Sequence, residues 1–375
     1  MRVAVIGLGS AGSMALWRLS LMADVEAIGF EQFGIGHPHG SFSGESRLFR
    51  TAYQEGAKYV PLLSRARELW GELESASGRR LFHRYGVLTV SRATNGPFVR
   101  LLDSIEEHGL PHELLDAAEL RERYPQLDVA DDEVGVLDPL GGALRPESGV
   151  LSAVKQARAN GAEVRDHDPV ISIADAGDGV DIVSESGTTR VDRVIVTAGS
   201  WSKLLIPELE PLVEVGRITL TWFVPEAAVE PLYQPEALPC FIRDRDSFHV
   251  FGAPIVDGYS AKISSDAHPP IGADRPELMD LRRDPAELSE FGREVRKIFP
   301  GVSPEPVHYS VHHDGFTPDK TPIIDRRGST VVVAGLSGHG YKLAPAYGEL
   351  AAQLATDLPA ETYHPDFAIA AHRPF

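Results

Sequence analysis

The chain has 375 residues, with 54 acidic and 36 basic side chains and a formal net charge of −18. A hydrophobic fraction of 43% excludes global disorder, and the acidity excludes a general electrostatic attraction to nucleic acid or anionic membranes. The single cysteine, Cys240, excludes an internal disulfide and a cysteine-based zinc site. The sequence has no signal-peptide core and no apolar stretch of roughly 18 residues, the length that a membrane helix needs. These features favour a soluble cytoplasmic protein.

The first 31 residues predict a strand, a glycine turn, a helix and a second strand. Residues 3–6 form an apolar run suited to a strand buried on both faces. The run Gly7-Leu8-Gly9-Ser10-Ala11-Gly12 follows, residues 13–22 favour a helix, and a strand over residues 25–30 ends at Glu31. This order is typical of a βαβ unit that binds a dinucleotide.

Each glycine of this G-x-G-x-x-G turn has a separate expected role. Gly7 allows the tight turn, Gly9 lets a pyrophosphate approach the backbone, and Gly12 lets helix and strand pack closely. Glu31 can accept hydrogen bonds from ribose hydroxyls, which favours FAD or NAD over NADP. An ordinary glycine turn is the alternative, and the flanking strands with Glu31 argue against it.

The rest of the chain alternates helical and strand-like segments. A polar, glycine-rich stretch spans residues 34–56. Helices are predicted over residues 59–77, 97–108, 149–160 and 286–298, and strands over residues 85–90, 163–173, 180–184, 189–197, 218–224, 248–252 and 330–334. The last strand leads into the glycine-rich run 335–342, and we expect Pro345 near the first turn of the next helix.

The order of these elements predicts an α/β protein with two interleaved domains. A Rossmann-like dinucleotide-binding domain would comprise residues 1–84, 146–214 and 320–375, with its first and last strands in one sheet. Residues 85–145 and 215–319 would form a β-rich substrate-binding domain.

Six motifs occur in order over nearly the whole chain. They are Gly7-x-Gly9-x-x-Gly12, the run from Gly40-Ser41 through Ser46-Arg47-Leu48-Phe49-Arg50 to Tyr59-Val60-Pro61-Leu62, Tyr85-Gly86-Val87-Leu88, Ala198-Gly199-Ser200-Trp201, Thr317-Pro318-Asp319-x-x-Pro322-Ile323-Ile324-Asp325, and Gly335-Leu336-Ser337-Gly338-His339-Gly340-Tyr341-Lys342. Together they resemble the flavin-dependent amine oxidases of the monomeric sarcosine oxidase and N-methyltryptophan oxidase family, within the D-amino acid oxidase superfamily. The resemblance implies that the two domains have the glutathione reductase-like, or D-amino acid oxidase-like, arrangement, and that the dinucleotide-binding domain is an FAD-binding domain.

The resemblance implies FAD and a small cationic site. Arg50 and Lys342 match the pair that grips the substrate carboxylate, a task for which the planar fork of arginine is suited. Arg47 matches an arginine beside the flavin, and Lys262 a lysine near flavin N5 that is linked to oxygen activation, so both are candidate catalytic residues. The alternative for each is a structural ion pair.

The resemblance also implies a set of FAD-contacting residues. These are Gly7, Gly9, Ser10, Gly12, Glu31, Ser41, Ser46, Arg47, Val170, Ala198, Gly199, Trp201, Gly338, Gly340, Tyr341 and Lys342.

Three positions depart from the family pattern. Where the family attaches FAD through a cysteine, this chain has His312, followed by His313, so we expect non-covalent FAD and no metal site. Asp266 replaces a histidine and Asp314 a tyrosine near the substrate; both are candidate catalytic and substrate-binding residues. Two extra carboxylates would suit a substrate with a further amine or several hydroxyls, unless they only pair with neighbouring cations.

These features predict an FAD-dependent oxidase of the CH–N bond of an amino acid, with a secondary amine favoured over a primary one. The imine product would hydrolyse to a carbonyl compound and an amine, and O₂ would yield hydrogen peroxide. A flavin dehydrogenase with another electron acceptor remains the main alternative. An NAD-dependent dehydrogenase would leave the 40–60 and 335–342 segments unexplained, and a non-catalytic flavin-binding protein would need no carboxylate grip. We expect a monomer or weak homo-oligomer.

Overall fold

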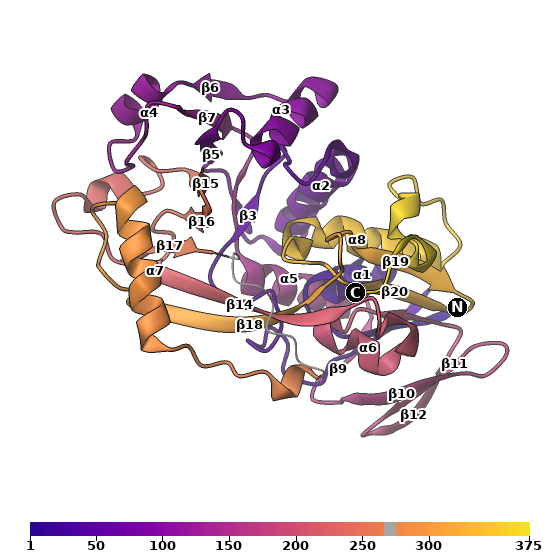
Figure 1. Ribbon diagram of the computed structural model, residues 1–375. Coiled ribbons are helices and arrows are strands. Elements are labelled where there is room, and N and C mark those ends of the chain that lie inside the picture. Colours follow the sequence, from indigo (N-terminus) through magenta and orange to yellow (C-terminus); the bar gives the residue numbers. More distant parts are fainter. Residues whose placement is uncertain (266–274) are drawn as a thin grey trace.

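The computed structural model describes residues 1–265 and 275–375. Within these residues, two large sheets lie in two parts of the molecule, and helices pack against each (Figure 1). The arrangement confirms the predicted α/β class, because one sheet is mostly parallel and the other is mostly antiparallel.

The six-stranded sheet combines distant parts of the sequence. Its strands, in spatial order, are β19 (Ile323–Arg327), β20 (Thr330–Ala334), β13 (Arg193–Val196), β1 (Arg2–Ile6), β2 (Glu26–Phe30) and β9 (Glu163–Arg165). All neighbouring pairs are parallel except β19–β20. The first and last strand–glycine–helix units therefore share one sheet, as predicted. Strands β1, β13 and β20 are apolar runs, as expected for strands covered on both faces.

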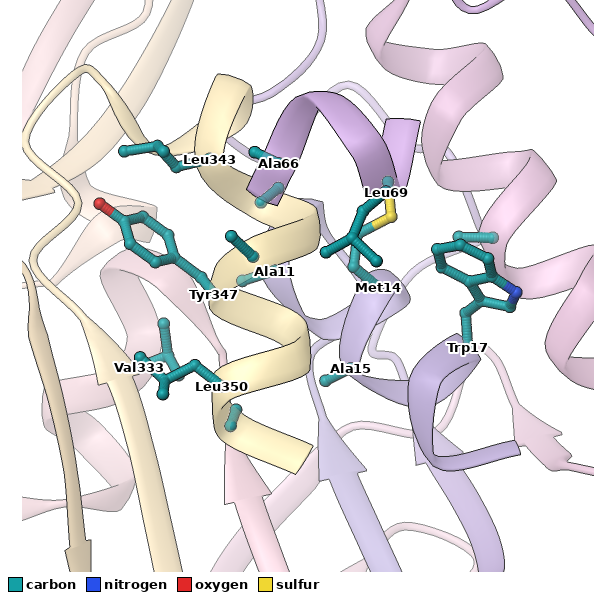
Figure 2. Packing of buried hydrophobic residues seen from close by; sticks show 14 of the residues in the cluster. Ala11, Met14, Ala15, Trp17, Ala66, Leu69, Val333, Leu343, Tyr347 and Leu350 are labelled. Atoms are coloured by element: carbon teal, nitrogen blue, oxygen red, sulfur yellow. The ribbon is translucent and has the colours of Figure 1, made fainter. Parts of the chain in front are cut away.

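Three helices, α1 (Ser10–Ser20), α5 (Pro146–Ala159) and α8 (Gly340–Ala355), pack together beside this sheet, with α2 (Val60–Ser77) against α8. Figure 2 shows Leu350 of α8 beside Val333 of β20, and Met14 of α1 beside Leu69 of α2, all within one buried cluster. Helices α1 and α8 approach closely because residue 348 is a glycine. A Cβ at this position would lie only 2.5 Å from the Ala15 backbone nitrogen. This packing fixes the N-termini of α1 and α8, and both N-termini reach the site described below.

The eight-stranded sheet forms the second part of the molecule. In spatial order its strands are β18 (His308–Phe316), β14 (Glu214–Phe223), β17 (Ala261–Ser264), β16 (Phe248–Ala253), β15 (Cys240–Arg245), β5 (Val87–Arg92), β7 (Glu133–Asp138) and β6 (Glu113–Leu115). Helix α7 (Pro285–Ile298) buries Val295 and Ile298 with Phe223, Phe241 and Val250 of the sheet. Helices α3 (Gly96–His108) and α4 (Ala117–Arg123) lie at the β5–β7–β6 end (Figure 1).

Smaller elements connect the two parts. One three-stranded sheet contains β3 (Arg47–Phe49), β8 (Gly142–Leu144) and β4 (Phe82–His83), and another contains β10 (Val170–Asp175), β11 (Val180–Ser184) and β12 (Gly187–Val191). Helix α6 spans Ser202–Leu205, and 3₁₀ helices span Ala57–Tyr59, Gly199–Trp201, Pro207–Leu209, Glu230–Tyr233, Pro276–Leu278, Pro365–Phe367 and Ile369–Ala371. None of the helices in residues 1–265 and 275–375 combines the length and apolarity needed to cross a membrane.

One expectation was wrong. Helix α8 begins at Gly340, so Pro345 lies inside the helix rather than in its first turn, and the carbonyl of Tyr341 loses the backbone donor that position 345 would normally supply. The glycine-rich 34–56 segment also contains a strand that the sequence did not indicate, because β3 pairs with β8.

Candidate functional site

The glycine turn between β1 and α1 is shaped by two close backbone approaches. Gly7 has φ +88°, and a Cβ there would lie 2.8 Å from the Ala198 Cα. A Cβ at Gly12 would lie 1.8 Å from the Gly7 carbonyl oxygen. At Gly9, by contrast, a Cβ would meet only the Phe42 ring, at 3.6 Å, among the described residues. The expected roles of Gly7 and Gly12 are confirmed, while the space beside Gly9 fits a bound group such as a pyrophosphate.

The first cavity, of about 510 Å³, begins at this turn. Glu31 lines it and is 4% exposed; its Oε2 accepts a hydrogen bond from the Leu8 N–H at 2.8 Å, and its Oε1 accepts one from the Phe33 N–H at 3.0 Å. A carboxylate held this way keeps lone pairs for ribose hydroxyls. The opposite walls come from Val170 and the Ala198–Trp201 turn.

A second cavity of about 410 Å³ continues from the first, because Ser10 and Ser41 line both. Every residue that the resemblance places at FAD lines one of these two cavities, apart from Gly12, which packs beneath the turn. The two connected cavities, with a helix N-terminus at their junction, fit a dinucleotide whose phosphates face α1.

Alternation along the eight-stranded sheet places one face of the sheet over the second cavity. Lys262 of β17 lies opposite Trp222 of β14 and Ala253 of β16, and residues directly opposite in antiparallel strands share a face. Phe251 lies two residues from Ala253 and opposite Ser264, so it faces the same side. The single lysine of this four-residue strand is therefore directed into the cavity, where the sheet excludes it from bulk water (3% exposed).

Arg47 and Lys262 are held by the same loop, residues 41–46. The Arg47 guanidinium donates to the carbonyl oxygens of Ser41 (2.8 Å), Ser43 (2.5 Å), Gly44 (3.4 Å) and Ser46 (2.8 Å). Lys262 Nζ donates to the carbonyls of Gly44 (3.1 Å) and Ser46 (2.7 Å).

Burial shifts the titration of both groups. It lowers the pKa of Arg47 to about 10, still far above neutrality. Burial and the nearby Arg47 charge hold the pKa of Lys262 well below its usual value. The indole of Trp222, whose ring centre is 5.5 Å from Lys262 Nζ, offers this cation a π face.

Arg50 and Lys342 meet around one tyrosine. The guanidinium carbon of Arg50 lies 4.9 Å, and Lys342 Nζ 5.3 Å, from the centre of the Tyr53 ring. Arg50 is 5% exposed, and its Nη2 donates to Glu55 Oε1 at 2.5 Å. Its Nε and Nη1 have no hydrogen-bond partner among the described residues, and neither has Glu55 Oε2. Unpartnered guanidinium N–H groups beside a cavity are costly unless a ligand satisfies them, which suits a carboxylate.

Glu55 and His339 complete this cluster. Burial acts to raise the pKa of Glu55, but Arg50 and Lys342 outweigh it and hold the pKa below its usual value. Burial and Lys342 lower the pKa of His339 to about 4, so this imidazole is neutral at pH 7. Its Nε2–H donates to the Lys320 carbonyl at 2.8 Å, so its Nδ1 accepts from the Tyr53 hydroxyl at 3.0 Å. The Tyr53 oxygen is thereby oriented to accept from Lys342 Nζ at 3.4 Å.

Asp314 lies in the second cavity but is committed to the backbone. Its Oδ2 accepts from the Gly338 N–H at 2.7 Å and its Oδ1 from the Gly315 N–H at 2.9 Å. Burial raises its pKa. These bonds join β18 to the turn before α8 and engage both oxygens that were expected to meet an extra amine. Asp266, the other candidate carboxylate, lies outside the described residues.

His312 and His313 lie apart from the second cavity. His312 Nε2 is 2.9 Å from Ser310 Oγ, and its Nδ1 is 3.3 Å from both Ser43 Oγ and the Gly40 carbonyl. Burial, with Arg47 nearby, lowers its pKa to about 3. His313 lines the first cavity and packs edge-on against Trp201. Within residues 1–265 and 275–375, no group of three or more His, Cys, Asp or Glu side chains is placed to hold a metal ion.

Sequence reasoning missed the partners of the predicted residues. Glu55 stands in a quoted motif, but nothing local indicates that it binds Arg50. Glu147, whose Oε1 accepts from the Gly44 N–H at 2.6 Å and so fixes the 41–46 loop, has no sequence signal at all.

Comparisons with known proteins agree with this geometry. Residues 2–354 match the family described as FAD dependent oxidoreductase. The chain is 32% identical to the monomeric sarcosine oxidase of Streptomyces avermitilis over 370 residues, covering 97% of this chain and 95% of that protein. It is also 32% identical to the N-methyl-L-tryptophan oxidase of Yersinia pestis over 379 residues, covering 98% of each.

Solved structures share the fold at lower identity. NikD, described as an unusual amino acid oxidase essential for nikkomycin biosynthesis, superposes with a TM-score of 0.84 at 21% identity, covering 98% of this chain and 96% of that one. Glycine oxidase from Geobacillus kaustophilus superposes with a TM-score of 0.81 at 18% identity, covering 99% of each chain.

Proposed function

The chain belongs to the FAD dependent oxidoreductase family, and we propose that it oxidises the carbon–nitrogen bond of an N-substituted amino acid. Arg50 carries the proposal, because it is a buried guanidinium beside the cavity that continues from the glycine turn, and two of its nitrogens have no partner among the described residues. The relatives named for sarcosine and N-methyl-L-tryptophan support a secondary amine as the substrate.

The residues of the second cavity bind and orient the substrate. Arg50 and Lys342 bind its carboxylate, which leaves the amine and the α-carbon to extend toward Lys262 and Arg47. When bound, FAD supplies the two-electron redox chemistry. The substrate loses two electrons and two protons to become an imine, and water then converts the imine to a carbonyl compound and an amine. Holding the carboxylate at a fixed point orients the reacting C–H bond, so no strongly basic side chain is needed if the amine binds neutral.

Lys262 and Arg47 supply positive charge at the other end of the cavity. Lys262 is buried and Arg47 is half-buried, and the carbonyl oxygens of residues 41–46 hold both in place. A fixed cation in a poorly hydrated site stabilises negative charge that develops when O₂ is reduced. We therefore propose O₂ as the acceptor, so that two electrons and two protons give hydrogen peroxide.

We also propose that FAD is bound without a covalent link. His312 lines neither cavity, and both of its ring nitrogens have polar partners. We further propose that the six-stranded sheet carries the FAD-binding domain and the eight-stranded sheet the substrate-binding domain. A cytoplasmic monomer or weak homo-oligomer fits the one cysteine, Cys240, which is fully buried and so unable to cross-link chains.

Purified protein tests the proposal. It should be yellow, acid precipitation should leave the flavin in the supernatant, and peroxide should appear with N-methyl amino acids. A yellow pellet would overturn the non-covalent assignment. Substrate-dependent reduction of a dye without any peroxide would overturn O₂ as the acceptor and favour a dehydrogenase. A colourless protein that takes up no FAD would overturn the proposed function.

A further inference from the structure

The second cavity carries a surplus of positive charge, although the whole chain has a net charge of −18. Among the residues that the structure describes, its lining contains six cationic side chains and two carboxylates. The cations are Arg47, Arg50, Arg100, Lys262, Lys320 and Lys342, and the carboxylates are Glu55 and Asp314. A cavity lined mainly by one sign of charge concentrates ligands of the opposite sign.

Four of the six cations already have a role in the proposed reaction, two with the substrate carboxylate and two with O₂. The two acidic residues are also engaged, because Glu55 accepts from Arg50 and Asp314 accepts from two backbone N–H groups. Arg100 and Lys320 are left over. Within residues 1–265 and 275–375, neither of them forms an ion pair with a carboxylate.

Arg100 of α3 lies beside the residues that bind Arg50. Its Nε donates to the Gln54 carbonyl at 3.0 Å. The residues on either side of this carbonyl, Tyr53 and Glu55, both contact the Arg50 guanidinium. Arg100 is exposed whereas Arg50 is buried, and both line the second cavity. The Arg100 guanidinium therefore lies at the mouth of the cavity, on the side where the substrate carboxylate is proposed to bind.

Lys320 reaches the same side of the cavity from a different segment. It is exposed, and its carbonyl accepts from His339 Nε2–H at 2.8 Å, while the other ring nitrogen of His339 bonds the Tyr53 hydroxyl. The backbone of Lys320 has φ +61°, a conformation that glycine adopts with less strain. A lysine at such a position in a cavity wall points to a function for its side chain.

These two cations lie at the carboxylate end of the proposed substrate rather than at its amine end. The amine extends from Arg50 toward Lys262, so an N-substituent lies away from Arg100. The side chain on the α-carbon is the part of the substrate that can reach the mouth of the cavity.

We propose that the preferred substrates are N-substituted amino acids with an acidic side chain, whose second carboxylate is bound by Arg100 and Lys320. The inference rests on the proposed function, since it assigns the substrate class of the same site. The guanidinium fork of Arg100 suits a carboxylate, and its bond to the Gln54 carbonyl holds it in one place.

A series of racemic N-methyl amino acids tests the inference through kcat/KM for peroxide release. The acids are N-methyl-aspartate, N-methyl-glutamate and N-methyl-2-aminoadipate, and each is compared with its side-chain amide, which has nearly the same size and no charge. The acid should exceed its amide by about fivefold at the best chain length, as expected for one partly exposed ion pair. This ratio should peak at one length, because Arg100 is held in place, and it should shrink in about 0.5 M salt.

The variants isolate the two cations. Arg100→Gln should bring the best acid-to-amide ratio to within about twofold of one, Arg100→Lys should keep part of it, and Lys320→Gln should lower it by about twofold. Arg293→Gln is the matched control: it removes the same charge from an exposed arginine of α7 that lines neither cavity, and it should keep the wild-type ratio.

Each outcome decides for or against the inference. The same ratio at all three lengths would show a long-range attraction without a binding site, and would overturn it. Ratios near one, or faster turnover of Nα-methyl-lysine than of every acid, would also overturn it and leave the proposed function intact. Failure to oxidise any N-methyl amino acid would overturn the proposed function and this inference together.

Discussion

Replacing Arg50 with methionine should remove most of the preference for a carboxylate. The wild-type guanidinium is 5% exposed and has two nitrogens without partners among the described residues, so a carboxylate can take both. A hydrogen bond to a charged group contributes about 1.5–3 kcal/mol. Because two such bonds to one group are not additive, we take about 3 kcal/mol for the pair, which corresponds to about 150-fold in kcat/KM.

The assay compares sarcosine with sarcosinamide, which has the same amine but no carboxylate. Wild-type protein should favour the acid by about 100-fold or more, and Arg50→Met should reduce this preference to within about tenfold. Glu55→Gln is the control: it removes the carboxylate that competes for Arg50, so the acid should bind at least as well as in the wild type. The reasoning is refuted if Arg50→Met slows both substrates equally or leaves the preference unchanged.

Three further predictions concern the cofactor turn, the buried lysine and the helix core. Gly9→Ala should weaken FAD binding in a fluorescence titration with little change in the apoprotein melting temperature. Gly12→Ala should lower both the FAD affinity and the melting temperature, because the Cβ of residue 12, unlike that of residue 9, would clash with the backbone. The kcat/KM for O₂ should fall as pH rises through the lowered pKa of Lys262, because the cation is then lost, and Lys262→Met should show a flat profile. The same fall with pH in Lys262→Met as in the wild type would contradict this. Glu349→Gln should cost about 1–3 kcal/mol of unfolding free energy at pH 7, because Glu349 accepts a bidentate pair from Arg65. Burial alone would raise the pKa of Glu349, but the arginines lower it, so denaturation curves of the two proteins should converge as pH falls below about 4.

The sequence predicted those structural features that depend on contacts between residues close together in the chain. The turn from Gly7 to Gly12 could be predicted because close backbone contact leaves no room for a Cβ at either end. The start of α8 could not. The helix begins two residues after Gly338, whose N–H donates to Asp314 of the distant strand β18, and no local pattern reports that contact.

Short strands with distant partners were also beyond prediction. Strand β3 has three residues, and Arg47 pairs with Leu144, so nothing near residue 47 indicates a strand. The pairing matters for the site, because it directs the residues around Arg47 toward the second cavity.

The sequence predicted which cationic side chains lie in the candidate site, but it did not predict their hydrogen-bond partners. Family motifs pointed to Arg50 and Lys342, which the structure brings together around Tyr53. Asp314, which the departures from the family pattern suggested for a further amine of the substrate, lines the second cavity, and its two oxygens each accept from one backbone N–H; its role toward a substrate stays a prediction. A sequence shows which side chains carry charge, but their hydrogen-bond partners are set by contacts between distant segments.

Anaerobic addition of an N-methyl amino acid to the purified protein tests the central claim most directly. The flavin absorbance should bleach in proportion to the substrate added, and admitting air should restore the colour with one hydrogen peroxide formed per substrate oxidised. A flavin that stays oxidised with every N-methyl amino acid offered would contradict the proposed oxidation of the carbon–nitrogen bond.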